Sequence, residues 1–232
     1  MNIVLYEDWG WQRFLPLVYT RSLFELFCGM DDLLAKVRRL HPNPALWCRP
    51  GLASLTTEKT RSPTNTVLSE PTLLLNGRGL WSQLPTIDAG DSSWIGTIGE
   101  AVACIWADAS LAPTLTPELL LDEARTRAAL ADLPRRNLDG NTHLIDWPWD
   151  LVHANRKALI SDWDHIAHHR SHSGRIDTGS VLLNPDAIHI GSETRIKPCS
   201  VIDAENGPVW IGNRVTISIA TTKYAAWKSP VR

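Results

Sequence analysis

Long apolar runs are missing from this sequence of 232 residues, and none reaches 18 residues. A transmembrane helix needs about 20 consecutive apolar residues, so we expect no membrane span and no membrane partner. The first ten residues, MNIVLYEDWG, contain neither a basic stretch nor a small-residue cleavage site, which indicates that no secretory leader is present. These absences predict a cytoplasmic protein.

Cysteines and excess basic charge are also scarce. The four cysteines, Cys28, Cys48, Cys104 and Cys199, show no CxxC spacing, and three of them lie in apolar surroundings. This pattern favours buried free thiols over disulfides or a zinc site. The formal net charge of −2 lacks the basic excess of nucleic-acid-binding proteins, so we expect no nucleic-acid partner.

Short apolar runs alternate with helical patterns over the first 150 residues. The runs, which are typical of strands covered on both faces, lie at 2–6, 45–49, 72–77, 101–107 and 142–146. Helical patterns lie at 30–40 and at 115–133, where Thr116 is a candidate cap before Pro117. The predicted fold class is α/β, with a Rossmann-like domain on a mostly parallel sheet. Ligands of such sheets bind beyond the carboxyl ends of the strands, so the loops after 2–6 and 72–77 are candidate sites.

A third helical pattern, at 149–169, places Val152, Leu159, Trp163 and Ile166 on one face and leads into a region with a six-residue period. Ile190, Ile196 and Ile202 are spaced by six, and Ile211 and Ile217 repeat that spacing. Such hexads are typical of β-helix solenoids, in which each aliphatic residue points inward. Two ordinary strands with turns are the alternative.

The repeat region is short. Residues 176–217 span 42 positions, and a coil of three hexads uses about 18, so roughly two coils fit, fewer than the ~3 repeats that a solenoid commonly needs. The last 15 residues, 218–232, lose the period and read as a non-repeat tail left by an early stop, a frameshift or a truncated copy. We expect the exposed last coil to be covered by this tail or by homo-oligomerisation, or else to aggregate.

Four segments resemble a known family. They are RFLPLVYTRSLFEL at 13–26, LLLNGRGLW at 73–81, PWDLVHANRKAL at 148–159, and VLLNPDAIHIGSETRIKPCSVIDAENGPVWIGNRVTI at 181–217. The chain is similar to the Bacteroidetes-type GlmU-like bifunctional family, which joins a sugar nucleotidyltransferase domain to a left-handed β-helix acyltransferase domain. The resemblance implies a nucleotidyltransferase-like domain at 1–170, a left-handed hexapeptide-repeat stub at 171–217 and the tail at 218–232.

The resemblance also implies substrates and activities. The first domain would take a nucleoside triphosphate and a sugar 1-phosphate as partners, transferring the nucleotidyl group and releasing pyrophosphate. In relatives, the acyl donor binds beside a catalytic histidine on later coils that are missing here, so we expect no acyltransferase activity. The alternative function is a non-catalytic sugar-nucleotide-binding or assembly module. Fold alone does not separate a transferase from such a module.

The same resemblance, by order and spacing, nominates residues for phosphate and substrate binding. By analogy with the pattern GTRLxPLT…K of the better-known nucleotidyltransferases, Arg13 stands where the arginine falls and Arg21 near the lysine. Both are the expected catalytic residues; solvated or structural arginines are the alternative. Asn76, Gly77 and Arg78 stand where better-known nucleotidyltransferases have Gly-Asp, and they are expected to bind substrate. An ordinary Asn-Gly turn is the alternative.

The Mg²⁺ expected from the same comparison needs carboxylates. An arginine does not ligate a hard cation, so Arg78 leaves Asp146 and Asp150 as the candidate metal ligands, with a helix cap as the alternative for Asp150. His165 and His169 have the i, i+4 spacing of a metal pair, but they lack the glutamate of HExxH, and histidines also suit a helix carboxyl end. Most of the 11 tryptophans lie in apolar runs, which indicates core or interface positions.

Overall fold

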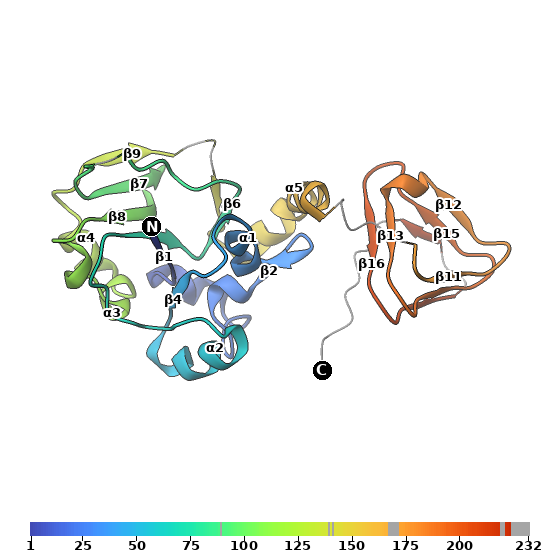
Figure 1. The fold of residues 1–232 in the computed structure, drawn as a ribbon, viewed down its shortest axis with the longest axis horizontal. Helices are drawn as coiled ribbons and strands as arrows, with labels where there is room; N and C mark the ends of the chain where they lie inside the picture. Colours follow the sequence, from blue (N-terminus) through green and yellow to red (C-terminus); the bar gives the residue numbers. More distant parts are fainter. Residues whose placement is uncertain (89, 139, 141, 167–171, 219–220, 224–232) are drawn as a thin grey trace. The chain divides into compact units, whose positions relative to one another are not determined.

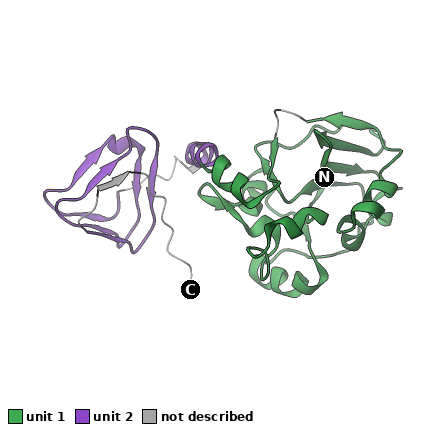
Figure 2. Ribbon diagram, turned by 180° about the vertical axis from the view of Figure 1, so that it is seen from behind, with its two compact units in different colours: residues 1–155 green, residues 156–232 purple. Residues whose placement is uncertain are grey.

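The computed structural model describes the chain except for residues 89, 139, 141, 167–171, 219–220 and 224–232 (Figure 1). The chain divides into two compact units, residues 1–155 and 156–232, coloured separately in Figure 2. The division falls inside helix α5 (Pro148–Ile166). Over the residues that the structure describes, no helix has the length and apolar character that crossing a bilayer requires.

Unit 1 is built on a six-stranded sheet with the order β4-β1-β5-β8-β7-β9. Its strands are β1 (Asn2–Tyr6), β4 (Ala45–Trp47), β5 (Thr72–Asn76), β7 (Trp94–Ile98), β8 (Ala101–Ala107) and β9 (Arg135–Asn137). Strand β1 pairs in parallel with both β4 and β5, and β7 pairs in parallel with β9. Only β8 runs antiparallel, between β5 and β7. The predicted α/β class with a mostly parallel sheet is confirmed.

Four of the five predicted strands lie in this sheet, and the fifth does not. The run at 142–146 forms β10 (Thr142–Leu144), which pairs antiparallel with β6 (Gly79–Trp81) in a separate two-stranded sheet. The sequence pattern did not predict strands β7 and β9. The second of these is the tripeptide Arg-Arg-Asn on the sheet edge, and without apolar side chains it shows no strand pattern.

Both faces of the central sheet are buried, as its continuous apolar strands require. Val4, Tyr6, Leu74 and Ile105 belong to a core cluster that also includes Leu115, Leu120 and Leu130 from the segment after β8. The intervening side chains Ile3, Leu5, Leu73 and Leu75 are buried as well. Because neighbouring residues of a strand point to opposite faces, the strands present buried side chains on both sides of the sheet.

The helices of unit 1 are short. They are α1 (Leu33–Leu40), α2 (Ala53–Thr60), α3 (Pro117–Leu120) and α4 (Glu123–Ala129), with the first turns of α5. The single helical pattern seen at 115–133 is split, because the Asp122 side chain accepts a hydrogen bond from the Arg125 amide at 3.0 Å and starts a second helix. Thr116 caps α3 as predicted, by accepting from the Leu119 amide. The remaining short elements of the unit are η1 (Trp9–Phe14), η2 (Leu23–Glu25), η3 (Pro50–Leu52), η4 (Ala112–Thr114), β2 (Phe27–Cys28) and β3 (Asp31–Asp32).

The described residues of unit 2 form three small parallel sheets, ordered β11-β14-β17, β12-β15-β18 and β13-β16. Their strands are β11 (Arg175–Ile176), β12 (Val181–Leu183), β13 (Ile188–Ile190), β14 (Arg195–Ile196), β15 (Val201–Asp203), β16 (Val209–Ile211), β17 (Thr216–Ile217) and β18 (Thr221–Lys223), with the 3-10 turn η6 (Pro185–Ala187) before β13. Arg175 pairs with Arg195 and Ile188 with Val209, so the chain returns to the same sheet after 20 or 21 residues. Strand β18 pairs with β15, so the pairing extends beyond Ile217 into the segment expected to be a non-repeat tail.

The isoleucines of the six-residue period form the core of unit 2. Ile190, Ile196, Ile202 and Ile211 are all buried in one cluster. Three exposed residues between the strands, Glu193, Cys199 and Arg214, adopt left-handed backbone conformations with φ from 57° to 66°. The part of α5 in this unit contributes Trp163, whose ring meets Trp210 edge-on at 6.3 Å. Val152, expected on the same apolar face of the helix as Trp163, is 73% exposed instead.

The cysteines behave as predicted. All four are free thiols, and Cys28, Cys48 and Cys104 are buried, whereas Cys199 is exposed. Burial raises the pKa of Cys104 to about 12, so this thiol stays protonated at neutral pH.

Candidate functional site

Two buried carboxylates follow the carboxyl end of β1, and each meets an arginine from a neighbouring strand. Tyr6, the last residue of β1, lies in register with Trp47 of β4 and with Asn76 of β5. Glu7 pairs with Arg49, two residues after β4, and Asp8 pairs with Arg78, two residues after β5. The parallel register therefore brings two ion pairs to one edge of the sheet, the edge where ligands of such sheets bind.

The Asp8–Arg78 pair is the better buried of the two. The Asp8 and Arg78 side chains are 1% and 3% exposed. Arg78 donates from Nε to Oδ1 of Asp8 at 3.0 Å and from Nη2 to Oδ2 at 2.7 Å, so both carboxylate oxygens are held by one guanidinium. Burial on its own lowers the pKa of Arg78, but the adjacent Asp8 carboxylate outweighs that effect together with Asp146, and the pKa is raised. The guanidinium therefore stays charged in a site closed to water.

Arg78 also ties this pair to the segment before helix α5. Its Nη1 donates to the Ile145 carbonyl oxygen at 3.0 Å and to Oδ1 of Asp146. Asp146 is 45% exposed, and Arg13 on the loop after β1 approaches the same oxygen at 3.5 Å. Arg78 is thus the centre of a charged cluster, defined here as Asp8, Arg78, Asp146 and Arg13, that passes from the buried strand ends to the surface.

Asn76 and Gly77 hold this cluster in place. The Asn76 side chain is buried; its Nδ2 donates to Oδ2 of Asp8 and to the Val102 carbonyl, and its Oδ1 accepts from the Arg78 amide. The Gly77 amide donates to the Tyr6 carbonyl at 2.7 Å, and a Cβ on Gly77 would lie only 2.9 Å from that oxygen. Close backbone approach therefore requires glycine here, and both groups of the Asn76 amide are engaged within the protein.

The second pair, Glu7 with Arg49, pins the loop after β1. Glu7 accepts from the Leu23 amide at 2.7 Å and from Nε of Arg49 at 3.1 Å. Arg49 in turn donates to the carbonyl oxygens of Val18 and Arg21, at 2.8 and 2.9 Å. The backbone around Arg21 is thereby fixed, while the Arg21 side chain is left exposed.

Among the expected site residues, Arg13, Asn76, Gly77, Arg78 and Asp146 meet at this edge. In the part of the chain that the structure describes, no ion pair or hydrogen bond joins the Arg21 side chain to them. Asp150 lies in the first turn of α5, where its Oδ2 accepts from the amides of Asp146 and Trp147 at 3.0 and 2.9 Å. Asp150 therefore performs the capping role that was its alternative in the sequence.

The Asp8 carboxylate does not fit as a ligand of a magnesium ion. Mg²⁺ needs free oxygen ligands in near-octahedral geometry. Oδ1 of Asp8 already accepts from the Gly10 amide and Arg78, and Oδ2 accepts from Asn76 and Arg78. The Arg78 guanidinium lies between the carboxylates of Asp8 and Asp146, where it would repel a dication. Over the described residues, no group of three His, Cys, Asp or Glu side chains is placed to hold a metal ion.

Asp8 was not singled out in the sequence, although it follows the first strand directly. Its position was a usable signal, because ligands bind beyond the carboxyl ends of such strands and the carboxylates of that loop lie there as well as its arginines. Trp147 and Trp149 beside the cluster are exposed, and the sequence did not distinguish them from the other tryptophans, most of which were predicted to be core or interface residues. His168 and His169 lie outside the described residues; His165 and His172 belong to unit 2.

The sheet edge that carries the charged cluster lies in a region that matches a known protein family. A family model described as "Sugar nucleotidyl transferase" matches residues 3–171. The match includes β1, β5 and the start of α5, and so every residue of the charged cluster. No curated protein matches the chain.

Proposed function

The chain belongs to the sugar nucleotidyl transferase family over residues 3–171, and we propose that it transfers a nucleotidyl group from a nucleoside triphosphate to a sugar 1-phosphate. The observation that supports this proposal is the placement of Arg13, Arg78 and Asp146 at the carboxyl edge of β1 and β5. In the proposed reaction, a phosphate oxygen of the sugar 1-phosphate attacks the α-phosphorus. The bond from that phosphorus to the β-phosphate oxygen breaks, and pyrophosphate leaves.

Two exposed arginines on the loop after β1 are the proposed phosphate contacts. Arg13 is 41% exposed, and the Arg21 side chain is exposed on the same loop. Arginine forks match phosphate oxygens and stabilise charge that shifts toward the leaving group. The buried pairs Glu7–Arg49 and Asp8–Arg78 neutralise themselves, so the charge available to phosphate comes from the exposed side chains.

Asn76, Gly77 and Arg78 act in this proposal as positioning residues. Arg78 holds Asp146 and the Ile145 carbonyl, and Asn76 holds Asp8. Most of the catalytic effect of such a site comes from the fixed placement of reactants. The buried frame beneath Arg13 and Asp146 supplies that rigidity.

A non-catalytic sugar-nucleotide-binding module is the second candidate function. It is favoured by the hydrogen bonds that Asp8 of the cluster and Asp150 beside it make within the protein, because the oxygens that accept these bonds are less available to a metal ion. Such a module would bind substrates at the same edge without turnover. Both functions use Arg13 and Arg21 for phosphate.

Titration and turnover separate the two functions. Isothermal titration with UTP or dTTP, with and without Mg²⁺, measures binding. Pyrophosphate release with glucose 1-phosphate and with glucosamine 1-phosphate measures transfer. Turnover supports the transferase, binding without turnover supports the module, and absence of binding by every nucleotide contradicts both.

For unit 2, we propose a short left-handed β-helix of the GlmU-like type without acyltransferase activity. The parallel return after 20 or 21 residues and the buried isoleucines support a β-helix. Each described sheet has at most three strands, so few coils are complete. Acetyl-coenzyme A and glucosamine 1-phosphate should give no free thiol with the purified chain, and light scattering should detect any homo-oligomer formed through the exposed strand edges.

A further inference from the structure

Two neighbouring tryptophans, Trp147 and Trp149, lie on the surface beside the charged cluster. They are 42% and 53% exposed, and their rings stack at a centroid distance of 5.0 Å with an angle of 6° between their planes. By contrast, Trp47, Trp81 and Trp94 of the same unit are at most 4% exposed. Full burial of a large apolar side chain contributes about 1.5 to 3 kcal/mol, so leaving these two residues about half exposed gives up part of that stabilisation.

The local backbone holds this pair in place. Pro148 stands between the two tryptophans as the first residue of α5, where its fixed φ suits the helix start. The Asp150 carboxylate accepts from the Trp147 amide at 2.9 Å and fixes the turn that carries both rings. The stacked surface is therefore formed before any ligand binds, and ordering it on binding costs little entropy.

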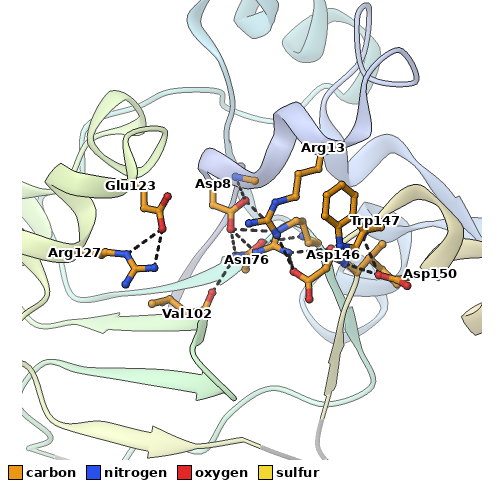
Figure 3. Close-up of polar contacts among 12 residues, drawn as sticks. Asp8, Arg13, Asn76, Val102, Glu123, Arg127, Asp146, Trp147 and Asp150 are labelled. Atoms are coloured by element: carbon orange, nitrogen blue, oxygen red, sulfur yellow. Dashed lines mark hydrogen bonds and ion pairs between the residues drawn. The ribbon is translucent and has the colours of Figure 1, made fainter.

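The pair is continuous with the proposed phosphate site. Trp147 follows Asp146 directly, and the Arg13 guanidinium lies 5.6 Å from the centre of the Trp147 ring while it also approaches Asp146 at 3.5 Å. Figure 3 shows Arg13, Asp146 and Trp147 side by side. A ligand with an anionic group at Arg13 and a flat ring several ångströms away matches this order of charge and aromatic surface.

We propose that Trp147 and Trp149 form a stacking platform for the nucleobase of the nucleotide, with Arg13 at its phosphates. The proposal rests on the proposed function and adds to it the part of the site that takes the base. A platform of this kind binds through the π-face, which every base has. It therefore predicts weak discrimination between uridine and thymidine nucleotides and a clear preference for a nucleotide over the same sugar phosphate without its base.

The test compares Trp149→Ala with Trp149→Phe, which keeps an aromatic face. Val152→Ala is the matched control, because Val152 is an apolar residue of the same helix that is 73% exposed. Titration calorimetry would use UTP, uridine 5′-monophosphate and ribose 5-phosphate, the last having no base. Loss of one base–aromatic contact corresponds to roughly 5- to 150-fold in affinity. We expect that loss for both nucleotides in Trp149→Ala, a smaller loss in Trp149→Phe and none in Val152→Ala.

Ribose 5-phosphate should bind the wild type and Trp149→Ala equally. Nucleotide binding that is unchanged in Trp149→Ala would overturn the platform while leaving the proposed function intact. Loss of glucose 1-phosphate binding without loss of uridine 5′-monophosphate binding would also overturn it, since the rings would then hold the sugar. Nucleotide loss in Trp149→Ala without any turnover by the wild type supports the platform and rejects transfer. A wild type that binds no nucleotide refutes both.

Discussion

Replacing Arg78 with methionine should destabilise unit 1 severely. The substitution keeps a long apolar stem but removes the guanidinium from Asp8, which is 1% exposed and cannot turn to water without local unfolding. Breaking a buried ion pair by deleting one partner costs about 3 to 5 kcal/mol, because the remaining charge is uncompensated. The Ile145 carbonyl, which accepts from Nη1 of Arg78 at 3.0 Å, loses its donor at a further cost of about 1 kcal/mol.

The combined loss, about 4 to 6 kcal/mol, is a large share of the stability of an ordinary domain. A domain of this size shifts in Tm by about 2 to 4 °C per kcal/mol, so we expect the unfolding transition of unit 1 to fall by roughly 10 to 20 °C. Thermal unfolding followed by circular dichroism measures this shift. The Tm of Arg78→Lys should lie between those of the wild type and Arg78→Met, because an ammonium keeps the charge but cannot match both carboxylate oxygens as the guanidinium does.

A double variant tests the mechanism itself. Asp8→Asn combined with Arg78→Met removes both charges, so its destabilisation should be smaller than the sum of the two single changes. Arg127→Ala is the control, because Arg127 pairs with Glu123 on the surface with 69% of its side chain exposed, and such pairs contribute at most about 1 kcal/mol. An Arg78→Met variant within about 1 kcal/mol of the wild type would refute the central role assigned to this side chain.

Three further predictions concern other parts of the chain. Arg21→Ala should keep the fold, because the side chain is exposed, and weaken nucleotide or sugar-phosphate binding by about 1.5 to 3 kcal/mol; equal affinity in calorimetry would remove Arg21 from the site. Gly77→Ala should destabilise unit 1 by about 1 to 3 kcal/mol, because the new Cβ would lie 2.9 Å from the Tyr6 carbonyl oxygen. Gly51→Ala is the control and should not destabilise it, because no atom lies within 4 Å of the Cβ position there. Similar melting curves for the two variants would contradict this. Burial lowers the pKa of His189, and the neighbouring His172 lowers it further. The stability of unit 2 should therefore be complete above the ordinary histidine pKa near 6.5 and should decrease as the pH falls below that value. A melting temperature that does not fall between pH 7.5 and pH 5 would argue against this.

Some of this architecture could be read directly from the residue pattern. The runs at 2–6 and 72–77 are continuous and apolar because the strands they form are covered on both faces, and the same pattern indicated a largely parallel sheet. Pro117 after Thr116 predicted a helix start, because the fixed φ of proline suits the first position of a helix. The six-residue period likewise marked the isoleucines that form the core of unit 2. The resemblance found in four segments led to the nucleotidyl transferase family that the family model supports.

Other features depended on hydrogen bonds that the residue pattern alone does not specify. The run at 142–146 has a strand pattern, but only pairing with β6 decided that it leaves the central sheet. The helical pattern at 115–133 is broken by Asp122, whose side chain competes for a backbone amide. Asp150 satisfied the sequence criteria for a metal ligand and for a helix cap equally well, and its two hydrogen bonds to backbone amides show the cap.

What the sequence determined by itself is therefore whatever follows from neighbours along the chain: the buried strands, the helix starts, the period of the isoleucines and the family. The tertiary structure alone decided the composition of the site, because Asp8 and Arg78 are 70 positions apart and meet only through the parallel register of β1 and β5. That register also placed the Arg78 guanidinium against Asp146, which the resemblance had nominated with Asp150 as a metal ligand. Charges in a buried site act on one another through space, so their roles are settled by which of them fold together.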